Sequence, residues 1–145
     1  MSSSDKKEEG CAYCDEGELL DAFGIKIAQL PASKLVLFKE QSHRGRLIVA
    51  STHHVSEIVD LSESERKAFV DDIVHVADAM HKALHPDKIN YGAYGDGGHH
   101  LHCHLCPKYA DDSFEWGSVF AMNPDRVHLD EDGYRDLAKL IVDNL

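Results

Sequence analysis

The stretch that decides the fold is His99-His100-Leu101-His102-Cys103-His104-Leu105-Cys106-Pro107-Lys108, which holds four of the eleven histidines. In an extended strand successive side chains point to opposite faces, so His100, His102 and His104 project together and the apolar residues between them face a core. Two residues of strand rise space neighbouring imidazoles about 7 Å apart. Imidazole suits proton transfer near neutral pH, nucleophilic attack and zinc ligation. One sheet face is therefore predicted to carry the chemistry.

Length and charge restrict the class of protein. The 145 residues suit one domain with a substantial core. Fifteen basic against 26 acidic residues give a net charge of -11, which argues against binding of DNA or RNA, because that needs a basic footprint. No apolar run is long enough to cross a bilayer, and the N-terminus lacks the apolar segment of a signal peptide. We therefore expect a cytoplasmic protein that binds neither nucleic acid nor membranes.

Hydrophobic periodicity predicts an α+β fold. Period-two alternation and turn residues predict five strands, and the two around the Gly-bearing loop suggest an antiparallel hairpin. Ser62-Glu-Ser-Glu65 fits a capping box at the start of the longest helix. Short helices are expected at 18–23 and 55–60. The predicted strands are 24–30, 34–39, 46–50, 88–94 and the histidine strand, in a five-stranded antiparallel sheet with one long and several short helices.

Three regions follow from composition. Residues 1–9 are polar and charged, so we expect a disordered tail. Residues 10–128 form the domain, and 129–145 a C-terminal helix packed on the domain or on a dimer partner. Within the domain, Cys11-Ala12-Tyr13-Cys14 indicates metal ligands or a redox pair, because cytoplasmic proteins rarely carry structural disulfides. Free surface thiols on a mobile tail are the plain alternative.

The pattern His100-Leu-His102-Cys-His104-Leu-Cys106 resembles the signature of the histidine triad (HIT) family, in which three histidines alternate with apolar residues. Arg46-Leu-Ile-Val-Ala through His54, and then 55–61, look like the family's hairpin strand, histidine and following helix. The similarity covers roughly residues 10–110, and the remainder looks like a bacterial branch. It implies a HIT-like fold, a homodimer and a nucleotide substrate, with hydrolysis or transfer of a nucleoside monophosphate from a phosphoanhydride or phosphoramidate. Dinucleoside polyphosphates and adenosine phosphoramidates are the implied substrates.

In the family the middle histidine of the motif is the nucleophile, which here is His102. Neutral imidazole can attack the α-phosphorus and form a nucleotidyl-histidine intermediate that water then opens. A backbone carbonyl that accepts the proton of one ring nitrogen would leave the other nitrogen free to attack. His104 would donate to a phosphate oxygen as negative charge builds. Alternatives are a non-catalytic nucleotide sensor, a pH-sensing cluster and a purely structural zinc-binding protein.

The resemblance also implies a metal site. Zinc-bearing relatives use a Cys-x-x-Cys, a histidine after the hairpin strand and the first histidine of the motif, which here are Cys11, Cys14, His54 and His100. Four protein ligands make such a zinc structural, because no coordination position stays open for water. His53 is a rival to His54. A Cys₄ site with Cys103 and Cys106 is disfavoured, because those two side chains point to opposite faces of the strand.

Substrate contacts follow the same resemblance. Glu40 stands where relatives bind ribose hydroxyls, and Asp96 where they place a residue beside the phosphate. Because an anion beside phosphate is repulsive, the alternatives for Asp96 are that it orients His104 or binds the leaving group. Gly97 and Gly98 would let backbone N–H groups approach a phosphate. Arg46 departs from some relatives, in which a histidine often precedes the strand.

Overall fold

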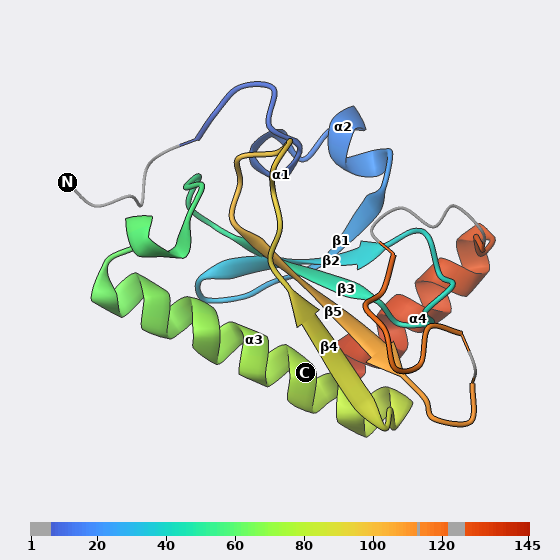
Figure 1. Ribbon diagram of the computed structural model, residues 1–145. Coiled ribbons are helices and arrows are strands. Elements are labelled where there is room, and N and C mark those ends of the chain that lie inside the picture. Colours follow the sequence, from blue (N-terminus) through green and yellow to red (C-terminus); the bar gives the residue numbers. More distant parts are fainter. Residues whose placement is uncertain (1–6, 113, 122–126) are drawn as a thin grey trace.

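The computed structural model describes residues 7–112, 114–121 and 127–145 (Figure 1). Five strands and the helices around them follow the predicted order, and the predicted α+β class is confirmed. The elements are α1 (Ala12–Asp15), α2 (Glu18–Asp21), β1 (Gly24–Gln29), β2 (Ser33–Phe38), β3 (Leu47–Ser51), the 3-10 helix η2 (Ile58–Asp60), α3 (Glu63–Leu84), β4 (Lys88–Gly92), β5 (His102–Lys108) and α4 (Glu131–Asp143).

The strands form one antiparallel sheet in the order β1-β2-β3-β5-β4. The histidine strand β5 therefore lies inside the sheet, between β3 and β4. Its register places His102 opposite Ala50 and His104 opposite Ile48. Because β3 pairs with both histidines and β4 also pairs with His104, the two histidines sit on rigid backbone, which suits a site that needs fixed geometry.

The two faces of the sheet have different cover (Figure 1). Helices α3 and α4 pack on one face, and the main core there includes Leu101, Cys103 and Leu105. Helices α1 and α2 cover the other face, where Tyr13 and Leu20 join a second cluster of buried side chains. The alternation predicted for β5 is therefore observed. No helix in the described part of the chain is long and apolar enough to cross a membrane.

Local signals account for the ends of α3. Ser62 Oγ accepts from the backbone N–H of Glu65, whose carboxylate accepts from the Ser62 N–H, so the predicted capping box is confirmed. The helix ends at Leu84, and the residue that caps it, His85, has a φ of 51°. Helices α2 and η2 are shorter than predicted. The Cys-x-x-Cys lies in and beside α1, which is too short for any periodicity in the sequence.

Asp72 ties α3 to the sheet and offers a test of the fold. Its buried carboxylate accepts from Ser33 Oγ at 2.5 Å and from the backbone N–H of Ala32 at 2.9 Å. We expect Asp72→Ala to lower the free energy of unfolding by about 1–3 kcal/mol, because two buried donors lose their acceptor. Urea denaturation measures this change.

The neighbouring Asp71 is the matched control. It is exposed and pairs with Lys67, one turn earlier on the same helix. Asp71→Ala should change the free energy of unfolding by less than about 0.5 kcal/mol. Equal losses from Asp71→Ala and Asp72→Ala would contradict the assignment of Asp72 as the link between helix and sheet.

Candidate functional site

The three histidines of the motif lie side by side on the face covered by α1. Backbone hydrogen bonds from Leu101 N to Val55 O and from Ser51 N to Leu101 O fix the segment that leads into β5. The ring of Tyr13 packs against both His100 and His102, with centroids 5.1 and 5.2 Å apart. The rings of His102 and His104 have centroids 5.3 Å apart.

His102 is held in one tautomer. Its Nδ1 lies 2.6 Å from the backbone oxygen of His100, and because a carbonyl only accepts, Nδ1 must carry the proton. Nε2 is then left with a free lone pair. Burial lowers the pKa of His102, and the hydrogen bond to His100 opposes that effect only in part. The ring is therefore neutral at neutral pH, as a nitrogen nucleophile must be.

His104 lies deeper, among aromatic rings. Phe38 and Phe120 pack against it, with ring centroids 5.8 and 6.1 Å away. Its Nδ1 is 3.2 Å from Nη2 of Arg46. Burial lowers the pKa of His104 to about 3, and the positive charge of Arg46 adds to that effect. His104 is therefore also neutral at neutral pH.

A cavity of about 280 Å³ opens beside His102. Gly97 and Gly98 border it, and apart from their adjoining residues no described residue has an atom within 4 Å of the position that a Cβ would take on either glycine. Asp96 is not among the described residues that line it. The lining residues are Glu8, Glu9, Gly10, Cys11, Tyr13, His54, Gly97, Gly98, His99, His100 and His102.

Glu40 lies apart from this cavity and is buried. Its carboxylate accepts from the N–H of Ser42 at 2.9 Å, from Ser42 Oγ at 3.0 Å and from the N–H of Val127. The carboxylate therefore ties the β2–β3 turn to the segment before α4. A ribose hydroxyl would have to share these acceptor oxygens.

Cys11, Cys14, His54 and His100 converge, with one ligand atom from each lying within 4.8 Å of all the others. Nδ1 of His100 is 3.3 Å from Cys11 Sγ and 3.6 Å from Cys14 Sγ. Nδ1 of His54 is 3.4 Å from Cys14 Sγ and 3.1 Å from Nδ1 of His100. Tetrahedral zinc with ordinary Zn–S and Zn–N bonds separates such atoms by about 3.3–3.8 Å. The donor set and its spacing therefore fit zinc.

Both histidines of this cluster are oriented by a second hydrogen bond. Nε2 of His100 donates to the backbone oxygen of Ser51 at 2.6 Å, and Nε2 of His54 lies 2.6 Å from the carboxylate of Glu8. Each ring therefore turns Nδ1 toward the thiols. Metal-binding histidines are commonly oriented in this way, by a hydrogen bond from the ring nitrogen that does not bind the metal. His53 is not part of the cluster.

Three features of the site were not predicted from the sequence: the packing of Tyr13, the contact of Glu8 with His54, and the contact of Arg46 with His104. The sequence holds a signal for Tyr13, because it is the aromatic residue between the two cysteines of the Cys-x-x-Cys. Glu8 had none, since it belongs to the predicted tail, of which residues 1–6 lie outside the described part of the chain. For Arg46 the sequence shows only that the residue differs from the histidine that many relatives carry there.

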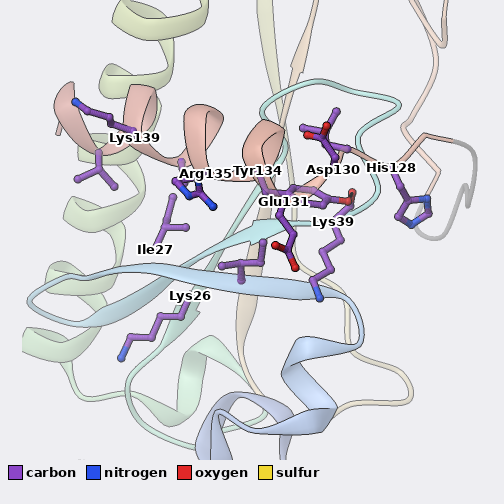
Figure 2. Close-up of a pocket in the computed structure, with 13 residues that line it drawn as sticks. Lys26, Ile27, Lys39, His128, Asp130, Glu131, Tyr134, Arg135 and Lys139 are labelled. Carbon is purple, nitrogen blue, oxygen red and sulfur yellow. Dashed lines mark hydrogen bonds between the residues drawn. The ribbon is translucent and has the colours of Figure 1, made fainter.

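A larger cavity of about 1090 Å³ lies elsewhere, between β1 and α4. Figure 2 shows Tyr134, Arg135 and Lys139 of α4 above Lys26 and Ile27 of β1. Its charged rim is largely satisfied by neighbours, since Lys26 pairs with Glu16, and Arg135 and Lys139 with acids of their own helix. No triad histidine lines it, so the smaller cavity beside His102 is the candidate site.

Comparisons with known proteins agree with this architecture. No protein-family model and no curated protein matches the chain. Among solved structures, a histidine triad protein from Sinorhizobium meliloti is 25% identical, with a TM-score of 0.78 over 89% of this chain and 95% of that one. A histidine triad protein from Bradyrhizobium japonicum is 22% identical, with a TM-score of 0.79 over 88% and 95%. A zinc-bound histidine triad family protein from Mycobacterium smegmatis is 23% identical, with a TM-score of 0.64 over 92% and 94%.

Fold and site together define an α+β domain with two histidines on the inner strand β5, a third on the segment that leads into it, and a Cys₂His₂ cluster beside them. The structural neighbours of this chain are histidine triad proteins, including a zinc-bound bacterial one, and the resemblance predicted from the motif is confirmed.

Proposed function

We propose that the protein is a nucleotide hydrolase or nucleotidyl transferase that works through a nucleotidyl-histidine intermediate on His102. The single observation that carries the proposal is the hydrogen bond of 2.6 Å from His102 Nδ1 to the backbone oxygen of His100. It leaves the Nε2 lone pair free in a residue that borders a cavity. The implied substrates are dinucleoside polyphosphates and adenosine phosphoramidates, as the family resemblance suggests.

In the first step, Nε2 of His102 forms a bond to the α-phosphorus, and the bond from phosphorus to the leaving oxygen or nitrogen breaks with its electron pair. The imidazole becomes positively charged as this bond forms. The carbonyl of His100, which accepts from Nδ1, stabilises that charge. In the second step, water or another acceptor attacks the phosphorus, and the N–P electron pair returns to His102. Over both steps water adds its OH group to the nucleoside monophosphate. The remaining proton is released when the leaving group is a phosphate oxygen, and it balances the proton taken up from solvent when the leaving group is the nitrogen of a phosphoramidate.

Around the phosphate, His104 is the proposed donor to a non-bridging oxygen. The backbone N–H groups of Gly97 and Gly98, which line the cavity beside His102, are proposed to approach the phosphate. Asp96 is proposed to bind on the leaving-group side and Glu40 near the ribose. A homodimer and a cytoplasmic location also stay predictions.

Cys11, Cys14, His54 and His100 are the residues that would hold zinc. With four protein ligands, zinc would supply a cross-link between the N-terminal segment and the strand that carries His102. Through this cross-link the four ligand residues would fix the position and orientation of His102.

A panel of dinucleoside polyphosphates and nucleoside phosphoramidates tests the function. We expect turnover of at least one class to a nucleoside monophosphate, and a protein adduct of one nucleotidyl group after a rapid alkaline quench, which preserves N–P bonds. The configuration at phosphorus should be retained, because two in-line displacements invert it twice. Tight binding without turnover would instead indicate a non-catalytic nucleotide sensor.

A further inference from the structure

Arg46 is fully buried beneath His104, which is an expensive position for a charged side chain. Its guanidinium lies over the ring of Phe38, 4.3 Å from the centroid, and over that of Phe120, 4.7 Å from the centroid. Nη1 donates to the backbone oxygen of Ala121 at 2.6 Å, and Nη2 lies 3.2 Å from Nδ1 of His104. The guanidinium is thus held by two aromatic rings and by contacts at both of its terminal nitrogens.

This contact decides the tautomer of His104. A guanidinium has donors and no acceptor, so Nη2 donates and Nδ1 of His104 must be the acceptor. The single proton of the neutral ring then sits on Nε2, the nitrogen farther from Arg46. In a protonated His104, the Nδ1–H would face the Nη2–H of Arg46, and two positive charges would lie side by side. Arg46 therefore disfavours both the other tautomer and the imidazolium.

His102 and His104 consequently hold opposite tautomers. His102 carries its proton on Nδ1 and presents a lone pair at Nε2, whereas His104 keeps its lone pair on Nδ1 and carries a proton at Nε2. His102 is arranged to attack and His104 to donate a hydrogen bond, and both rings are neutral. Resting on the proposed function, we infer that Arg46 is a positioning residue that fixes His104 as the Nε2–H donor to the substrate phosphate.

The segment that completes this arrangement is itself anchored. The carboxylate of Glu115 accepts from the N–H of Ala121 at 3.1 Å and lies 2.7 Å from Nε2 of His43. Nζ of Lys108 donates to the backbone oxygens of Glu115 and Ser118. These bonds hold Ala121 and the adjoining Phe120 against the guanidinium. Arg46 therefore has a fixed orientation toward His104, as a positioning role requires.

The tautomer is measured directly by long-range ¹H–¹⁵N spectra of the full-length, zinc-loaded protein with ¹⁵N-labelled histidine, at neutral pH and without substrate. His104 is assigned by the signals that disappear in His104→Gln. We expect a single neutral species protonated at Nε2. An Nδ1–H tautomer or an imidazolium in the wild type overturns the inference, whether or not any variant folds. This measurement is independent of turnover, so failure of the proposed function would leave it standing.

Variants test whether the contact matters for catalysis. Arg46→Met keeps the length and removes the donors, and it should mix the His104 tautomers and lower kcat by about 10- to 100-fold, less than the loss of a direct donor. KM should change by less than about threefold, because the donor acts mainly in the transition state. Arg46→Lys, which keeps a donor, should restore part of the single tautomer and part of kcat. The matched control is Arg44→Met at the exposed neighbouring arginine, which should leave kcat unchanged.

A double-variant cycle separates positioning from simple packing. In a His104→Ala background, Arg46→Met should lower kcat by less than about twofold further, since it acts through a ring that is no longer present. The same 10- to 100-fold loss in both backgrounds would mean that Arg46 acts independently of His104, and it would overturn the inference.

Discussion

His102→Ala is expected to abolish nucleotidyl transfer, with a loss in kcat on the order of 10³- to 10⁶-fold, because the side chain that forms the covalent bond is gone. Nucleotide binding should weaken far less, because His102 contributes one wall of its cavity and the glycine turn another. Steady-state kinetics and equilibrium titration measure the two effects separately. The alkaline-quench adduct should also disappear.

His81→Ala is the matched control for this substitution. His81 is an exposed histidine on α3, on the other face of the sheet from the candidate site. Its removal should leave kcat and the adduct unchanged. If nucleotidyl release by His102→Ala matched that of the wild type, the proposed mechanism would be wrong. If the adduct persisted, its nucleophile would be another residue.

The fold was predictable because its signals are local. Period-two alternation around His102 and His104 specifies a strand with one apolar face. The burial of Leu101, Cys103 and Leu105 in the core follows from that pattern. The start of α3 was also readable, since a capping box needs only four residues of sequence. Each of these elements is determined by neighbours in the chain.

The parts that escaped prediction depend on contacts between distant segments. Helix α1 has no periodicity to detect, and tertiary contacts hold it: Nζ of Lys34 donates to Tyr13 O at 2.5 Å and pairs with Glu16 at 2.9 Å. The contact of Arg46 with His104 depends on Ala121 O, far along the chain. No pattern in the sequence pairs a carbonyl with a buried guanidinium. The resemblance was silent there too, because relatives often carry a histidine at that position.

The second large effect concerns the Cys₂His₂ cluster. Cys11→Ser/Cys14→Ser should lose its zinc, because a hydroxyl is a poor replacement for a thiolate ligand. A ligand present at 1,000 times its Kd stabilises the folded state by about 4 kcal/mol, and about 2–4 °C in Tm per kcal/mol then gives a fall on the order of 10 °C. Elemental analysis and thermal unfolding measure both quantities. Adding a chelator should reproduce the fall in the wild type and have no effect on the double variant.

Cys103→Ala is the matched control, because it removes a buried thiol that lies outside the cluster. It should keep full zinc content, whereas a Cys₄ site built with Cys103 would lose metal. Hydrogen exchange should localise the damage in the double variant to the segment around Cys11 and to the turn that carries His54. Protection in β3 and β5 should persist, because Lys34 still holds α1 and the sheet keeps its own core. Full zinc content in the double variant would rule out these four residues as the ligand set.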